Sequence, residues 1–300
     1  MSQGALTTAD RTRALVVVVI WGLNFVAMKY ALQDMGPMLL GALRFALASL
    51  PFLWWVGRPR LPWRFVVGYG LAQGLGQFGC LFLGLQLGMT AGMASVVMQA
   101  QAFFTLLLGV PVLGERARPA QVLGLVVASA GLITIAMAHG EGAGQMTLIG
   151  FVLTLGAAFM WAVSNLVARL ASRVADYEPF PFIVWSSLVP ILPFTALAVW
   201  QDGWAGVATQ WAAIGPLTVA SLLFLAWLAT LLAYSLWTRL LKRHPANRVT
   251  PFSLLVPVVG LWSAWFFVGE HPVPLQWLGT AAVVLGLVIN QIGPRWGRLP

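Results

Sequence analysis

Several amide, hydroxyl and aromatic side chains lie deep within long apolar runs of the sequence, at similar distances from the ends of those runs. Asn and Gln side chains each offer a donor and an acceptor, so together they suit a small zwitterion. Aromatic rings add an apolar surface and attract an ammonium group. We therefore expect a hydrated cavity whose substrate-binding residues are Asn24, Gln73, Gln77, Gln99, Gln101, Trp161, Asn165, Thr230 and Tyr234.

The alternative interpretation is that these polar side chains only hold helices together. Amides and hydroxyls inside a membrane commonly bond neighbouring helices, at about 0.6–2 kcal/mol each. For any single residue both interpretations stay open. For the whole set the cavity is favoured, because several apolar runs offer amides at one level and such groups must face protein or water.

The composition places these residues in a membrane protein. Of 300 residues, 60% are hydrophobic and 8% are charged, whereas a soluble domain has about 25% charged residues. The net charge of +9 comes from basic residues that recur between apolar runs rather than in one patch, which favours a lipid bilayer and excludes a nucleic-acid partner. The single cysteine, Cys80, allows no intramolecular disulfide and no cysteine-based metal site.

Ten apolar runs approach the length of about 20 residues that crosses a bilayer. Backbone polar groups must be bonded internally in hydrocarbon, so each run is expected to be helical, in an all-α membrane protein. No joint between the runs is long enough to be a soluble domain. The expected spans are 14–32, 37–56, 65–87, 91–113, 120–138, 146–170, 180–200, 215–238, 249–268 and 275–292.

The distribution of Lys and Arg predicts the orientation of the spans. If the N-terminus is cytosolic, 15 of the 17 basic residues fall in cytosolic segments. The other two, Lys29 and Arg44, lie within spans, and the external joints hold none. This bias predicts that both termini are cytosolic.

Two halves of the sequence repeat each other. The segment VLGERARPAQVLG in the first half resembles FVGEHPVPLQWLG in the second, so that Gly114 and Glu115 match Gly269 and Glu270 at a constant offset of 155. Trp21 corresponds to Trp161 at an offset of 140. We expect two five-helix repeats, 1–141 and 142–300. Because five is odd, the second repeat enters from the opposite face, as in secondary transporters with a midplane site.

The runs VVVVIWGLNFVAMKYAL and PFSLLVPVVGLWSAWFFVGE, with the ALRF around Arg44, closely resemble EamA-type exporters of the drug/metabolite transporter superfamily. The resemblance covers nearly the whole chain. It is greatest to bacterial inner-membrane exporters of cysteine-type and aromatic amino acids. It implies ten helices and efflux of neutral and aromatic amino acids by alternating access. Neither the preferred amino acid nor the oligomeric state follows from it, and a monomer is compatible.

Charged residues near the span ends are expected to stabilise the fold rather than to bind substrate. Lys29 and Arg44 lie toward the external ends of their spans, where we expect snorkelling or pairing with Asp34, with a substrate contact as the alternative. Glu115 and Glu270 each follow a Gly and precede a Pro. We expect each carboxylate to cap the helix that follows, with gating as the second interpretation.

All eight acidic residues fall at span ends or in joints, so the usual proton-relay carboxylate is missing from the spans. This disfavours the runner-up function, a multidrug exporter of lipophilic cations, and leaves facilitated movement or a less obvious coupling site. An enzyme is disfavoured as well, because His139, His244 and His271 all lie outside the spans. Neither a metal-ligand spacing nor a nucleotide-binding loop is present, so no cofactor is expected.

Overall fold

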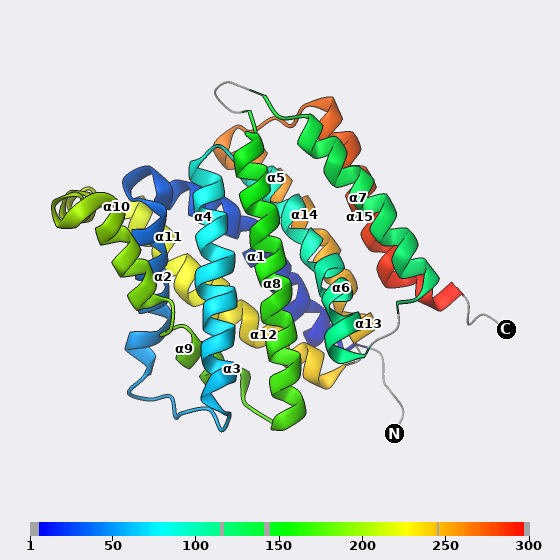
Figure 1. Cartoon of the computed structure of the whole chain (residues 1–300), viewed down its shortest axis with the longest axis horizontal. Helices are drawn as coiled ribbons and strands as arrows, with labels where there is room; N and C mark the ends of the chain where they lie inside the picture. The colour runs from blue at the N-terminus through cyan, green and yellow to red at the C-terminus, as the bar shows by residue number, and fades with distance from the viewer. Residues whose placement is uncertain (1–5, 115–116, 141–144, 245, 297–300) are drawn as a thin grey trace.

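The computed structural model describes residues 6–114, 117–140, 145–244 and 246–296, and every regular element within them is a helix (Figure 1). The first half contains α1 (Thr8–Asp34), α2 (Pro37–Ser49), α3 (Trp63–Tyr69), α4 (Gly79–Gln86), α5 (Ala91–Val97), α6 (Gln101–Leu113) and α7 (Pro119–Met137). The second contains α8 (Leu148–Val174), α9 (Pro179–Ser186), α10 (Ile191–Ala212), α11 (Pro216–Leu223), α12 (Ala233–Arg243), α13 (Ala246–Val249), α14 (Val256–Val268) and α15 (Pro274–Trp296). Short π or 3-10 stretches join some of them, namely η1 (Leu50–Phe52), η2 (Gly70–Phe78), η3 (Met98–Ala100), η4 (Phe224–Leu232) and η5 (Thr250–Leu255).

Eight helical stretches of the described residues are long and apolar enough to cross a membrane. The stretch Pro37–Phe52 is apolar but shorter, and α15 lies along α7 at one side of the bundle (Figure 1). The prediction of an all-helical membrane protein is therefore confirmed. The number of ten crossings and the cytosolic position of both termini stay predictions.

Two of the long helices contain a π-helical stretch at their centre. The stretch η2 joins α3 to α4, and η4 joins α11 to α12. They begin at Gly70 and Phe224, 154 residues apart, which is within one residue of the offset between the repeated motifs. A π turn leaves the α-helical bonding pattern and is frequent at functional sites. The two irregularities therefore lie at equivalent positions of the two halves.

The repeated Gly-Glu motif has a conformational reason for its glycine. Gly114 ends α6 and Gly269 ends α14, each with φ of 69°. This left-handed conformation is the usual helix stop and is easily adopted only by glycine. Glu115 lies outside the described residues, and its expected capping role stays a prediction.

The helices α7 and α15 approach each other through four glycines. A Cβ atom added at Gly124 would lie 2.5 Å from the carbonyl oxygen of Gly286, and one at Gly131 would lie 2.6 Å from that of Gly279. In the sequence repeat, Gly124 corresponds instead to Gly279 and Gly131 to Gly286. Such crossed pairing is what a two-fold axis between the helices produces. The packing agrees with the inverted repeat that the sequence predicts.

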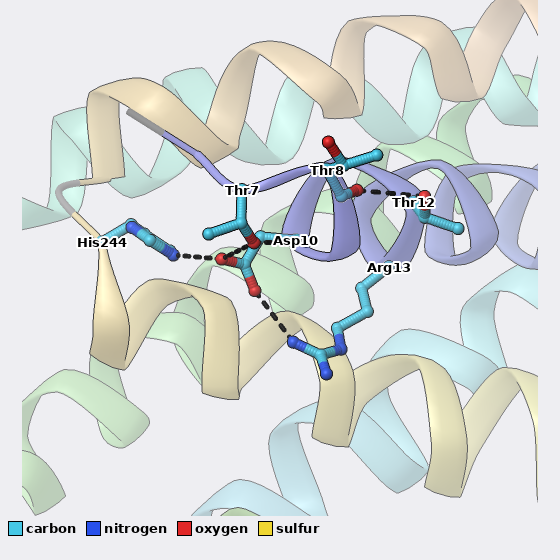
Figure 2. Close-up of polar contacts among 6 residues, drawn as sticks. All are labelled: Thr7, Thr8, Asp10, Thr12, Arg13 and His244. Carbon is cyan, nitrogen blue, oxygen red and sulfur yellow. Dashed lines mark hydrogen bonds and ion pairs between the residues drawn. The ribbon is translucent and has the colours of Figure 1, made fainter. Parts of the chain in front are cut away.

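The start of α1 is tied to the end of α12 (Figure 2). Thr7 Oγ1 accepts from the backbone N–H of Asp10 at 3.1 Å and so caps α1. The Asp10 carboxylate lies 2.9 Å from Arg13 Nη1 and 2.9 Å from His244 Nε2. These contacts place the first turn of α1 and the last turn of α12 at the same end of the bundle.

The end of the seventh expected span differs from the sequence-based limit. The expected span 180–200 begins in α9, but α10 continues to Ala212. Gly203, with φ of 66° and ψ of 169°, is not helical, so α10 consists of two helical segments that meet at this residue. Trp204 and Trp211 lie in the second of these segments. The expected limit at residue 200 lies three residues before this break, and the sequence-based span did not include the second helical segment.

The glycine contacts of α7 and α15 generate a stability prediction. An added methyl usually favours a helix by about 1 kcal/mol, but Gly131→Ala would press against a backbone oxygen and cost about 1–3 kcal/mol. We expect a lower thermal unfolding midpoint for Gly131→Ala in detergent. The matched control is Gly68→Ala, whose added Cβ would meet its nearest neighbour, Val167, at 3.7 Å. Equal midpoints for the two variants would contradict this packing.

Candidate functional site

The bundle encloses a cavity of about 520 Å³. Its walls come from α1, α3, α6, α8, α9, α12, α14 and α15, together with η3 and η5. Exposed residues of α8 and α12, including Arg169, Ser172 and Leu241, line one end of it. That end is the mouth, and it lies at the end of the bundle where α12 meets the start of α1.

The inner wall of the cavity is aromatic. Trp21 of α1 packs edge-on against Trp161 of α8, with ring centroids 6.0 Å apart. It also contacts Tyr234 at 5.1 Å and Trp237 at 5.3 Å, both on α12. The Trp21 indole N–H donates to the carbonyl oxygen of Ala229, within η4, at 3.4 Å. One half of the molecule therefore presents Trp21 to an aromatic group in the other half.

The predicted amides bond between helices and line the cavity at the same time. Asn165 Nδ2 donates to Gln101 Oε1 at 2.9 Å and to Thr105 Oγ1 at 3.3 Å, which joins α8 to α6. Gln99 Nε2 donates to the carbonyl oxygen of Ser253 in η5 at 2.7 Å. Four of these side chains, those of Gln99, Gln101, Thr105 and Asn165, line the cavity and offer it polar surface that a bound molecule can contact. The two interpretations of the amides are thus compatible.

A second, much smaller cavity of about 30 Å³ lies beyond the aromatic wall. It shares Trp21, Gln99, Trp161, Tyr234 and Val256 with the main cavity. Its other lining residues include Asn24, Arg44 and Gln77. A volume of this size holds about two water molecules. The aromatic side chains therefore form a partition between the two spaces.

Arg44 corrects a sequence-based prediction. We expected it to snorkel to the external surface or to pair with Asp34, but its exposure is only 1%. Its Nε and Nη2 donate to Thr230 Oγ1 at 3.1 and 3.0 Å. Asp34 instead accepts from the backbone N–H of Gly215 at 3.1 Å and from the Thr218 hydroxyl, so it caps α11. Position along α2 did not reveal that Arg44 faces the interior of the bundle.

The structure brings together most of the nine predicted residues. Five line the main cavity, namely Gln99, Gln101, Trp161, Asn165 and Tyr234, and the smaller cavity adds Asn24 and Gln77. Gln73 and Thr230 are buried and line neither space. Gln73 is near the Tyr234 hydroxyl, and Thr230 anchors Arg44. Both contact a side chain that lines a cavity, and their predicted role in substrate binding stays a prediction.

Sequence reasoning missed several lining residues. Trp21 could have been found, because the sequence repeat pairs it with Trp161. Tyr69, Trp237 and Gln291 carried no such signal, since each is one polar or aromatic residue among many. The Gln291 Oε1 atom is buried without a hydrogen-bond partner and belongs to a residue that lines the main cavity. It is an acceptor available to a bound donor.

Tyr177 lies beside the mouth, in the segment between α8 and α9. Burial, with a smaller contribution from the negative charge of Asp176, raises the pKa of its hydroxyl to about 12. The phenol therefore stays neutral at physiological pH.

A partly buried ion pair links α1 to the segment after α14, at the opposite end from the mouth. Lys29 Nζ lies 2.5 Å from Glu270 Oε1. The two carboxylate oxygens also accept from the backbone N–H groups of Ala91 and Gly92, each at 2.9 Å. Glu270 was expected to cap the helix that follows it, and this prediction is wrong: it caps α5, 179 residues earlier. Charge and helix dipole both favour the carboxylate there.

Comparisons with known proteins agree with this architecture. The EamA-like transporter family matches residues 13–137 and 148–291. A probable amino-acid metabolite efflux pump of Escherichia coli is 41% identical over 98% of both chains, and its Salmonella typhimurium counterpart is 42% identical over the same shares. A probable terminal-alkyne amino-acid exporter of Streptantibioticus cattleyicolor is 28% identical over 92% of this chain and 91% of its own.

One crystal structure of a protein with 19% identity superposes with a TM-score of 0.64, covering 96% of this chain and 97% of the other. At this identity the likeness shows the fold alone.

The ion pair at the closed end generates the next prediction. Glu270→Ala would leave two backbone N–H groups uncapped and Lys29 without its partner, at a cost of about 2–3 kcal/mol. We expect a lower thermal unfolding midpoint in detergent. Glu178→Ala is the matched control, because Glu178 also precedes a helix but is exposed and forms no capping hydrogen bond. Equal stability of the two variants would show that the ion pair contributes nothing.

Proposed function

The chain belongs to the EamA-like transporter family, and on this premise we propose that it exports amino acids and related metabolites from the cytoplasm. It is a multi-pass protein of the bacterial inner membrane. The proposed substrates are neutral and aromatic amino acids, with cysteine-type metabolites among them. One chain encloses the whole cavity, so a monomer would suffice for transport.

The observation that carries this proposal is the combination of amides and aromatic rings around the main cavity. A volume of about 520 Å³ accommodates a single small metabolite. The amides of Gln101 and Asn165 offer donors and acceptors to a zwitterion. The rings of Trp21 and Trp161 offer an apolar surface to its side chain and attraction to its ammonium group.

We further propose that ten spans cross the membrane with both termini in the cytosol, as two inverted repeats, 1–141 and 142–300. In that orientation the mouth of the cavity faces the cytosol. The pair of Lys29 and Glu270 closes the external end. Transport then follows alternating access: the ion pair opens and the mouth closes as the halves move around the midplane cavity.

The runner-up function, export of lipophilic cations, has less support. Proton-coupled export of a cation requires a carboxylate that can hold either a proton or the substrate. Among the described residues no Asp or Glu lines either cavity. Arg44 lines the smaller cavity together with the aromatic partition, and its positive charge repels cations.

Uptake into proteoliposomes distinguishes these functions. We expect labelled phenylalanine, threonine and cysteine to enter liposomes that contain the purified protein, with or without an imposed pH gradient. Empty liposomes are the control. Uptake of a lipophilic cation under a pH gradient, without uptake of any amino acid, would replace this proposal with the cation exporter.

Two cavity substitutions test the site. Trp161→Ala removes the aromatic contact and Gln99→Ala removes the bond to η5, so each is expected to reduce amino-acid uptake by about tenfold. The matched controls are Trp200→Ala, whose indole is 80% exposed, and Gln86→Ala, at the exposed end of α4. Both controls should transport normally. Normal uptake by folded Trp161→Ala and Gln99→Ala would exclude this cavity as the substrate site.

A further inference from the structure

Arg44 is a buried cation that the structure holds in a fixed place. Thr230 Oγ1 accepts from two of its nitrogens, and Asn24 Oδ1 lies 3.5 Å from Nη1. The guanidinium carbon lies 3.9 Å from the centre of the Phe78 ring. Contacts from α1, η2 and η4 thus fix a side chain of α2 at the centre of the bundle.

No protein carboxylate neutralises this charge among the described residues. Lys29, the other basic residue within a span, has Glu270 as its partner, whereas no ion pair joins Arg44 to an Asp or Glu. A buried charge without a partner is strongly unfavourable. A neutral side chain could bridge Asn24 and Thr230 without this penalty. The charge itself therefore calls for a second explanation besides helix packing.

The Arg44 guanidinium has N–H groups that form no hydrogen bond with the side chains around it. Arginine carries five N–H groups, and the hydrogen bonds to Thr230 and Asn24 account for three of them. Arg44 also lines the smaller cavity, together with Gln77, whose Oε1 is buried without a partner. Unused donors and an unused acceptor thus lie around one space, which is separated from the main cavity by Trp21, Trp161 and Tyr234.

We propose that Arg44 binds the carboxylate of the substrate once the aromatic partition has moved. This inference rests on the proposed export of amino acids and identifies the group that recognises them. At about 30 Å³ the smaller cavity is too small for a carboxylate, so binding requires Trp161 or Tyr234 to shift. The substrate's ammonium group and side chain then remain on the side of the aromatic rings, away from the positive charge.

This arrangement gives the site a definite chemical selectivity. A carboxylate accepts charge-assisted hydrogen bonds from a guanidinium, which are about twice as strong as neutral ones. An amino-acid amide keeps the ammonium group and loses the carboxylate, so it brings a net positive charge toward Arg44. The site therefore selects zwitterions and rejects the corresponding cations.

Binding of matched ligands to the purified full-length chain tests the proposal. The probes are phenylalanine and phenylalanine amide, measured by calorimetry in detergent. We expect the native protein to bind phenylalanine at least about tenfold more tightly than the amide. Arg44→Gln should abolish this preference by weakening phenylalanine binding. Arg44→Lys, which retains a charge without the planar fork, should bind phenylalanine more weakly yet still prefer it to the amide.

The control is Arg60→Gln, at an exposed position outside the helices, which should keep the native preference. Equal binding of the acid and the amide by the native protein would overturn the role of Arg44 even if Arg44→Gln does not fold. So would a folded Arg44→Gln that keeps the preference. In either case amino-acid binding would still support the proposed function. Absence of binding and of uptake for every amino acid would overturn both.

Discussion

The hydrocarbon interior of a membrane offers no water to polar groups, and this constraint governs where every charge of the protein lies. Glu270 illustrates the result, because one carboxylate serves both an ammonium group and two backbone N–H groups at the start of α5. Without this carboxylate, the partly buried cation and the two N–H groups of the helix end would each lose their partner. The tie links segments from both halves of the chain, so closure of one end of the bundle is a consequence of satisfying buried polar groups.

The same constraint gives the cavity its character. Amides that bond between helices, such as Asn165 with Gln101, also present unused donors and acceptors to the interior space. The aromatic cluster around Trp21 supplies the apolar part and divides the space in two. A transporter needs a polar path through an apolar solvent, and here that path is built from groups that stabilise the fold as well.

The sequence predicts the features that follow from composition and from repeated patterns. It does not predict contacts between residues that are distant in the chain. Long apolar runs identify the helices, and the repeat identifies Trp21 and Trp161 as related positions. The depth of Arg44 was misjudged because a position along a helix does not reveal which face looks inward. The partner of Glu270 was misjudged because a Gly-Glu pair shortly before a Pro suggests a local cap, whereas the helix whose N–H groups donate to it begins 179 residues earlier. Both errors concern charges whose partners are set by tertiary packing.

The π-helical stretches η2 and η4 have a mechanical consequence. Each contains more residues per turn than the α-helix on either side of it, and each contributes a residue to the smaller cavity, Gln77 from η2 and Ala229 from η4. If such a stretch reverted to α-helical bonding by one residue, every side chain beyond it would rotate by about 100° around the helix axis. The part of the helix beyond the stretch would thereby present a different stripe of residues to its neighbours, while the part before it kept its orientation. Rotation within two individual helices can therefore change which side chains face the cavity, without requiring either half to tilt as a rigid unit.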